Sequence, residues 1–149
     1  MNTTPHILEL FAEQVKRFAG KPALKSANTS LTYRELDHIS NRWAHFFIKQ
    51  GAAGKCIGIT LNRSTRIPEV ILGVLKSGSV YVFIDPRYPD ERKRYIMEDS
   101  GIQLIVTSRK TELAETRLPV IFTDDEPMRD MPVTPPETTL SGNDLAYIM

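Results

Sequence analysis

Few residues of this 149-residue sequence combine the side-chain type and the position that chemistry requires. Asn62, Arg63, Ser64 and Thr65 form a polar turn between an apolar run and a helical pattern, the place where open α/β sheets bind ligands. Arg63 would hold an anion there, but no glycine-rich phosphate fingerprint is nearby, so a helix cap with a solvated arginine is favoured. Asp85 follows a second apolar run, a position at which a carboxylate could be catalytic, and the prolines at 86 and 89 prevent the strand from continuing.

The other candidates have simpler structural explanations. His38 and His45 lie seven residues apart on one helical pattern, whereas a metal pair normally uses positions four apart, so we expect both to be solvated. Cys56 has no identifiable base beside it and is interpreted as a small buried strand residue. The acidic run 124–126 is expected to be solvated loop and not a metal site. We therefore assign no catalytic, cofactor-binding or metal-ligating residue in this chain.

Composition excludes several classes of protein. The 19 lysines and arginines nearly balance the 18 acidic residues, which removes the electrostatic argument for a nucleic-acid partner. The single cysteine allows no intrachain disulfide and fits a reducing compartment. The sequence starts with no signal-peptide pattern, and no apolar run approaches the roughly 18 residues that span a bilayer. We expect a cytoplasmic protein without a membrane partner.

Helical and strand patterns alternate along the chain. Thr4 and Asp90 are expected to cap the first and fourth helices, and Thr32 with Glu35 forms a capping box for the second. The expected helices run from Thr4 to Gly20, from Thr32 to Gly51, over 69–76 with Pro68 in the first turn, from Asp90 to Gly101, and over 110–115. The expected strands cover 22–26, 31–33, 56–61, 80–84, 104–106, 120–122 and 143–149.

This alternation predicts an α/β fold in which a mostly parallel sheet is flanked by helices on both faces. Trp43, Phe46 and Phe47 recur at helical spacing and are expected in the core. Residues 124–142 contain four prolines and are expected to form an irregular surface excursion.

Two segments carry a resemblance to a known family. The first is Leu-Thr-Tyr-Arg-Glu-Leu at 31–36, followed by Asn41-Arg42 and Ala44. The second is Leu-Lys-Ser-Gly-Ser-Val-Tyr-Val-Phe-Ile-Asp-Pro-Arg-Tyr-Pro at 75–89. Both resemble the first core motifs of amino-acid adenylation domains of nonribosomal peptide synthetases, members of the adenylate-forming, AMP-binding superfamily. The ending at 144–149 resembles the entry into the third core motif, so the likeness covers nearly the whole chain in order.

The sequence also departs from the family at three positions. Phe83 stands where the family usually has proline, and Ser77 and Val80 replace small alanines. These differences suggest altered local packing and leave the resemblance intact. The resemblance also implies that Asp85 is part of a turn and not a catalytic residue.

The resemblance implies one domain over 1–149 that corresponds to the first subdomain of an adenylation domain. The complete domain uses ATP and Mg²⁺ to form aminoacyl-AMP, then transfers the amino acid to a carrier-protein thiol. In the family, the phosphate-binding loop, the amino-acid pocket, the ribose-binding acid and the C-terminal lysine come after the part matched here. None of them maps onto this sequence, so we predict no cofactor for this chain and no activity for it alone.

Three hypotheses remain open. The chain is an N-terminal fragment of an adenylation domain, or half of a split enzyme that a second polypeptide completes. Alternatively, it is a non-catalytic module that self-associates through an unpaired C-terminal strand, because strand edges pair readily with other chains. The expected partners are the remainder of the adenylation domain, carrier and condensation domains of the parent synthetase, and, for the third hypothesis, a second copy.

Overall fold

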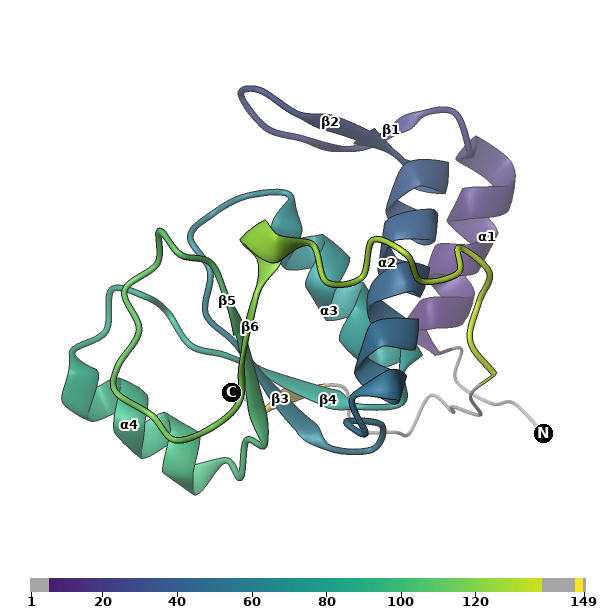
Figure 1. Cartoon of the computed structure of the whole chain (residues 1–149). Helices are drawn as coiled ribbons and strands as arrows, with labels where there is room; N and C mark the ends of the chain where they lie inside the picture. Colours follow the sequence, from purple (N-terminus) through teal and green to yellow (C-terminus); the bar gives the residue numbers. More distant parts are fainter. Residues whose placement is uncertain (1–5, 138–146, 149) are drawn as a thin grey trace.

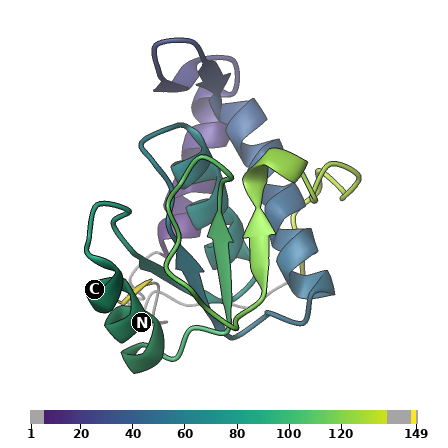
Figure 2. The ribbon, with the colours of Figure 1, turned by 60° about the vertical axis from the view of Figure 1, so that its left-hand side comes forward.

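The computed structural model describes residues 6–137 and 147–148. Its larger sheet has five strands in the order β6-β5-β3-β4-β7, and all four neighbouring pairs are parallel. Neighbouring strands run in the same direction in Figure 2. The strands are β3 (Cys56–Ile59), β4 (Val80–Phe83), β5 (Leu104–Thr107), β6 (Val120–Phe122) and β7 (Tyr147–Ile148). The predicted α/β fold with a parallel sheet is therefore confirmed.

The described residues also form four α-helices and a short hairpin that is separate from this sheet. The helices are α1 (Ile7–Phe18), α2 (Tyr33–Lys49), α3 (Arg66–Lys76) and α4 (Asp90–Asp99), and the antiparallel hairpin pairs β1 (Pro22–Lys25) with β2 (Ser30–Thr32). In Figure 1, α1 runs beside α2 and the hairpin extends from the end of this pair. Within the part of the chain that the structure describes, no helix combines the length and the apolar character needed to cross a membrane.

The predicted capping box starts α2. The Thr32 hydroxyl accepts the Glu35 amide at 3.1 Å, and the Glu35 carboxylate accepts the Thr32 amide at 2.8 Å. The amides at the start of a helix have no hydrogen-bond acceptor inside the helix. Because the capping box supplies acceptors for two of them, it fixes where α2 begins. Pro68 is the third residue of α3, where a missing amide donor costs little, as predicted.

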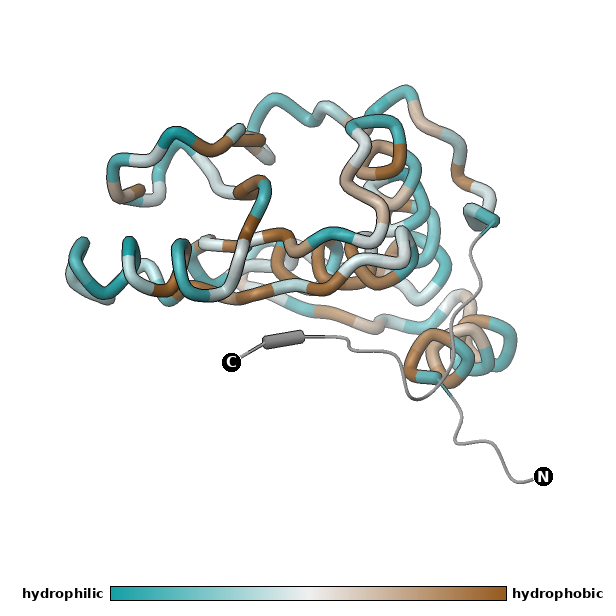
Figure 3. The backbone as a smooth tube through the Cα atoms, turned by 90° about the horizontal axis from the view of Figure 1, so that it is seen from below, coloured by the Kyte–Doolittle hydropathy of each residue, from teal (hydrophilic) through white to brown (hydrophobic). Residues whose placement is uncertain are grey.

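Two apolar clusters lie on opposite faces of the sheet. Strand β5 alternates between them, because Leu104 and Val106 pack with Trp43 of α2 and Val74 of α3, whereas Ile105 packs on the other cluster. The second cluster also contains Met97 of α4. Helices therefore cover both faces of the sheet, as predicted. In Figure 3, many of the hydrophobic segments lie in the middle of the molecule.

Close contact between α2 and α3 depends on one glycine. A Cβ added at Gly73 would lie 2.4 Å from the Cβ of Trp43, well inside van der Waals contact. Trp43 and Phe47 are fully buried and stack with ring centroids 5.6 Å apart, and Phe46 is 6% exposed. The predicted aromatic core is confirmed, and Gly73 lets α3 approach it.

Three sequence expectations about helices are wrong. Helix α1 begins at Ile7 with His6 as its cap, and Thr4 lies outside the described residues. Pro89, not Asp90, occupies the cap position of α4, so Asp90 lies in the first turn, where the helix dipole favours a negative charge.

The helix expected over 110–115 is absent: these described residues form turn and irregular backbone. Six residues are too few to offset helix nucleation. Instead, Leu113 and Ala114 pack into the α4-side cluster.

The proline-rich excursion is irregular, as predicted, over its described part, apart from a 3₁₀ turn at Thr123–Asp125. However, it is fastened to α2. The Asn41 side-chain amide donates to the Val133 carbonyl at 2.7 Å, and a ring nitrogen of His45 lies 2.8 Å from the Thr134 carbonyl. We call residues 126–137 the strap; residues 138–142 lie outside the described part.

The expected strand over 143–149 is observed for Tyr147–Ile148; residues 143–146 and 149 lie outside the described part. This strand pairs with β4 of the same chain at an edge of the sheet. The hypothesis of self-association assumed an unpaired strand, so that assumption is wrong on the β4 side.

The family departures have visible consequences. The buried Ser77 hydroxyl donates to the Val74 carbonyl at 2.6 Å and lies 3.0 Å from the Ser79 hydroxyl, which donates to the Ala52 carbonyl. This chain of hydrogen bonds ties the end of α3 to the loop before β3. Phe83 is 39% exposed at the end of β4.

Candidate functional site

The carboxyl ends of β3 and β4 border a hollow of about 400 Å³. The turn residues Asn62 and Arg63 line one side of it, and Asp85 and Arg87 line the other. The structure thus brings together the two turns in which sequence analysis found candidate anion-binding and acidic residues.

Asp85 is held within its own turn. One carboxylate oxygen accepts the Arg87 amide at 2.9 Å, and the other accepts the Arg87 guanidinium at 2.7 Å. These bonds hold the pKa of Asp85 down at about 2, mainly through the Arg87 side chain. Asp85 is therefore an ionised, turn-closing carboxylate, in line with the structural interpretation of the sequence.

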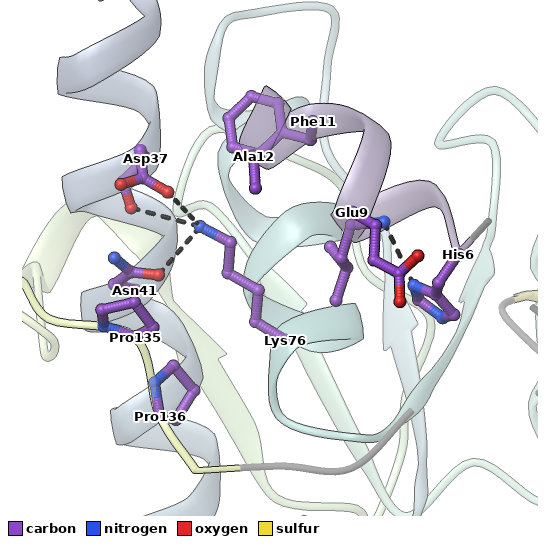
Figure 4. Close-up of a pocket in the computed structure, with 10 residues that line it drawn as sticks. His6, Glu9, Phe11, Ala12, Asp37, Asn41, Lys76, Pro135 and Pro136 are labelled. Carbon is purple, nitrogen blue, oxygen red and sulfur yellow. Dashed lines mark hydrogen bonds and ion pairs between the residues drawn. The ribbon is translucent and has the colours of Figure 1, made fainter. Parts of the chain in front are cut away.

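The most enclosed charged residue of the motifs is Lys76, at the end of α3. Only 8% of the residue is exposed, yet its ammonium donates to three α2 side chains: Asp37 at 2.9 Å, Ser40 at 2.7 Å and Asn41 at 2.8 Å. Figure 4 shows Asp37 and Asn41 converging on the ammonium. We call Asp37, Ser40, Asn41 and Lys76 the Lys76 cluster.

This cluster joins the two motifs that carry the family resemblance. Asn41 belongs to the first motif and Lys76 to the second, and they are bonded side chain to side chain. The same Asn41 amide donates to Val133, so the cluster also fixes the strap. The ring of Phe11 from α1 lies 5.1 Å from the ammonium, within the range of a cation–π contact.

Burial and pairing act on Lys76 in opposite directions. Burial lowers the pKa of Lys76, because the charged form loses water, while Asp37 raises it by hydrogen bonding and by its charge. The ammonium is already bound by acceptors of α2, so the arrangement is a brace between helices and not a group presented to a substrate.

A hollow of about 290 Å³ lies beside the cluster, between α1 and the strap. Glu9, Phe11 and Ala12 of α1 line it, with Pro135 and Pro136 of the strap on the opposite side (Figure 4). Sequence analysis did not select Lys76 as a site residue. A lysine that directly follows the apolar run 70–75 was the available signal, because such a charge needs partners when the helix packs.

The remaining sequence candidates do not converge. His38 is exposed, and His45 of the same helix contacts the strap instead of a second histidine. Burial raises the pKa of the Cys56 thiol, which disfavours the reactive thiolate. Among residues 6–137 and 147–148, no group of three histidine, cysteine or acidic residues is arranged to hold a metal.

The acidic run 124–126 has partners that the sequence did not predict. Asp124 accepts the Arg109 amide at 2.9 Å, and Asp125 pairs with the Arg109 guanidinium at 2.9 Å. Glu126 pairs with Arg66 of α3 at 3.0 Å, and the two arginines Arg66 and Arg129 lower its pKa. These residues connect the start of the strap to its neighbours.

Two basic side chains of the motifs already have acidic or polar partners. Arg87 at the carboxyl edge is occupied by Asp85, and Lys76 is occupied by α2. These pairs give Lys76 and Arg87 a structural role.

Comparison with known proteins identifies the family. The family described as AMP-binding enzyme matches residues 11–149. Surfactin synthase subunit 3 of Bacillus subtilis (strain 168) is 35% identical over 144 residues, 93% of this chain but 11% of that protein. Bacitracin synthase 3 of Bacillus licheniformis is 35% identical over 150 residues, 99% of this chain and 2% of that protein. The chain thus spans a small part of these relatives.

Solved structures share the fold. The nonribosomal peptide synthetase FmoA3 superposes with a TM-score of 0.87 at 21% identity, covering 99% of this chain and 16% of that chain. The N-terminal subdomain of Klebsiella oxytoca NpsA gives a TM-score of 0.87 at 21% identity, covering 98% of this chain and 38% of that chain. From the family match over residues 11–149, this chain belongs to the AMP-binding enzyme family.

Proposed function

We propose that this chain supplies the N-terminal scaffold of an amino-acid-activating adenylation domain of nonribosomal peptide synthesis. The parent reaction joins an amino acid to ATP, giving aminoacyl-AMP and pyrophosphate, and then passes the aminoacyl group to a carrier-protein thiol. ATP and Mg²⁺ would serve the complete domain, and carrier and condensation domains would be its neighbours in a synthetase.

One observation carries the proposal. The Asn41 and Lys76 side chains, one from each family motif, are hydrogen-bonded at 2.8 Å inside a parallel α/β scaffold. The motifs therefore have a structural reason to occur together, since each supplies half of the brace. The extent of the family match, residues 11–149, supports the same assignment.

The proposed role excludes catalysis by these residues alone. Adenylate formation needs the attacking carboxylate held in line with the α-phosphate and the charge on the departing pyrophosphate neutralised. Two cations of the motifs are already paired: Lys76 with Asp37, and Arg87 with Asp85. The completing partner is therefore the remainder of an adenylation domain, on the same or on a second polypeptide.

A chimera tests the proposal. Residues 1–149 would replace the matching segment of an adenylation domain of surfactin synthase subunit 3, and ATP–pyrophosphate exchange would be measured across a panel of amino acids. We expect exchange with the amino-acid preference of the recipient, because the family's selecting residues come after this segment. A folded chimera without exchange, or one with a changed preference, would contradict the scaffold role.

A matched pair of variants sharpens this test. In the chimera, Lys76→Met removes the brace, whereas Arg87→Gln breaks only an exposed pair in which the arginine side chain is 89% exposed. We expect lower thermal stability for the first variant and a nearly unchanged chimera for the second. Equal loss of stability in both would contradict the role given to the Lys76 cluster.

A further inference from the structure

Two buried hydroxyl groups on neighbouring strands have no partner within the described protein. Thr60 directly follows β3 and is 1% exposed; Thr107 ends β5 and is fully buried. The side-chain oxygen of each lacks a hydrogen bond to any described residue. A buried hydroxyl without a partner costs about 1–3 kcal/mol, so two such groups call for an explanation.

The two residues are lateral neighbours. Strands β3 and β5 are parallel, with Ile57 opposite Leu104 and Ile59 opposite Val106. The Thr60 amide donates to the Val106 carbonyl at 3.0 Å, so the pairing continues by one residue and places Thr60 beside Thr107.

Both side chains lie on the α4 face of the sheet. Along β5, Ile105 packs in the α4-side cluster, and strand alternation puts Thr107 on the same face. Along β3, Gly58 faces Ile102 and Ile105, whereas Ile59 and Leu61 belong to the opposite cluster. By alternation, Thr60 lies on the same face as Gly58. The two hydroxyl-bearing carbons therefore project side by side.

The spacing suits a single bridging molecule. Neighbouring strands are about 4.8 Å apart, and the two hydroxyl groups are not hydrogen-bonded to each other. A water molecule with two bonds of about 2.8 Å at a tetrahedral angle spans about 4.5 Å. An apolar or charged ligand has no comparable match, since the two residues are almost completely enclosed.

We infer that Thr60 and Thr107 form a binding site for one internal water molecule, which bridges their hydroxyl groups and joins the carboxyl ends of β3 and β5. Strand β3 ends one residue before Thr60 and β5 ends at Thr107, so both threonines lie where the chain leaves the sheet. The water adds a side-chain link beside the backbone hydrogen bond from Thr60 to Val106. This inference is independent of the proposed adenylation role.

A double-mutant cycle on the full chain tests the site, with the folding constant measured by urea denaturation. Valine has the shape of threonine without the hydroxyl. If the water is bound, Thr60→Val and Thr107→Val each leave the other hydroxyl without its bridged partner. We therefore expect each variant to lower the folding constant about tenfold. The double variant should lose about as much as one single variant, far short of the hundredfold product.

If no water is bound, each valine substitution should raise the folding constant instead of lowering it. Each valine would then remove an unpaired hydroxyl from apolar surroundings, and both variants would raise the folding constant additively. Thr111→Val is the matched control, because the Thr111 hydroxyl bonds the Ser108 hydroxyl at 2.8 Å. Its effect should be additive with that of Thr60→Val.

A high-resolution crystal structure of the full chain decides the case if a valine variant fails to fold. We expect one density peak within about 3 Å of both threonine oxygens. Thr60→Ser, which keeps the hydroxyl, should retain the peak. Absence of the peak, or a direct bond between the two hydroxyl groups, would overturn the inference.

Discussion

Replacing Lys76 by methionine tests whether the Lys76 cluster stabilises the fold. Methionine keeps most of the apolar stem, so the change removes mainly the ammonium group. Three acceptors lose their donor: the Asp37 carboxylate, the Ser40 hydroxyl and the Asn41 amide oxygen. Of these residues, Ser40 and Asn41 are fully buried.

The magnitude follows from burial. Removing one member of a buried ion pair costs about 3–5 kcal/mol, and each buried neutral acceptor left without a hydrogen-bond donor costs about 1–3 kcal/mol. Two effects reduce this sum: the Asp37 side chain is 26% exposed and regains water, and the burial penalty that lowers the pKa of Lys76 disappears. We therefore expect Lys76→Met to lower the free energy of unfolding by about 2–3 kcal/mol.

Urea denaturation followed by tryptophan fluorescence measures this change, because Trp43 is the only tryptophan and is fully buried. Asp37→Asn in the Lys76→Met background should recover part of the loss, since the unpaired carboxylate becomes a neutral amide. A Lys76→Met protein as stable as the parent, or more stable, would refute the reasoning. It would mean that desolvation of the ammonium outweighs its three hydrogen bonds.

The same residue makes a pH prediction. Burial lowers the pKa of Lys76 below its ordinary value of 10.5, so the unfolded chain holds the proton where the folded chain has begun to release it. The unfolded state then binds more protons, and stability from this group rises with pH up to about 10.5. As pH rises toward 10.5, the free energy of unfolding of the parent should therefore increase relative to that of the Lys76→Met variant. A relative decrease would contradict this prediction.

Three further changes have defined outcomes. Gly73→Ala should destabilise the chain by about 1–3 kcal/mol in urea unfolding, because its Cβ would meet Trp43; a neutral result would contradict the close packing. The Asp85 carboxyl should titrate at about pH 2 by NMR and move toward 3.8 in Arg87→Gln, so its stabilising contribution is lost as pH falls from 3.8 toward 2. His45→Ala should speed proteolysis within the strap without changing the core, and unchanged cleavage would show that the His45 contact does not fasten it.

Local sequence signals predicted most of the fold. Thr32 and Glu35 are three residues apart and satisfy each other's backbone partners, so the start of α2 needed no tertiary information. Short β-branched runs such as 56–59 likewise predicted buried parallel strands. The helix expected over 110–115 failed because burial of Ala114 and its neighbours, not local propensity, determines that backbone.

The candidate site depended on contacts that are distant in sequence. Lys76 and Asn41 are 35 residues apart, and Asn41 and Val133 are 92 apart, so spacing along the chain contains no sign of either bond. The proline content of 124–142 predicted irregular backbone correctly. It did not predict that His45 and Asn41 would fasten this segment to α2, because the acceptors are backbone carbonyls, which every residue has.

The most direct test of the central claim is formation of aminoacyl-AMP by the purified 149-residue chain. The chain would be incubated with ATP, Mg²⁺ and each of a panel of amino acids, with a complete adenylation domain of surfactin synthase subunit 3 as the positive control. The scaffold role predicts aminoacyl-AMP with the control and none with this chain. Aminoacyl-AMP made by the isolated chain would contradict it, because the catalytic groups would then lie among residues assigned to bracing and packing.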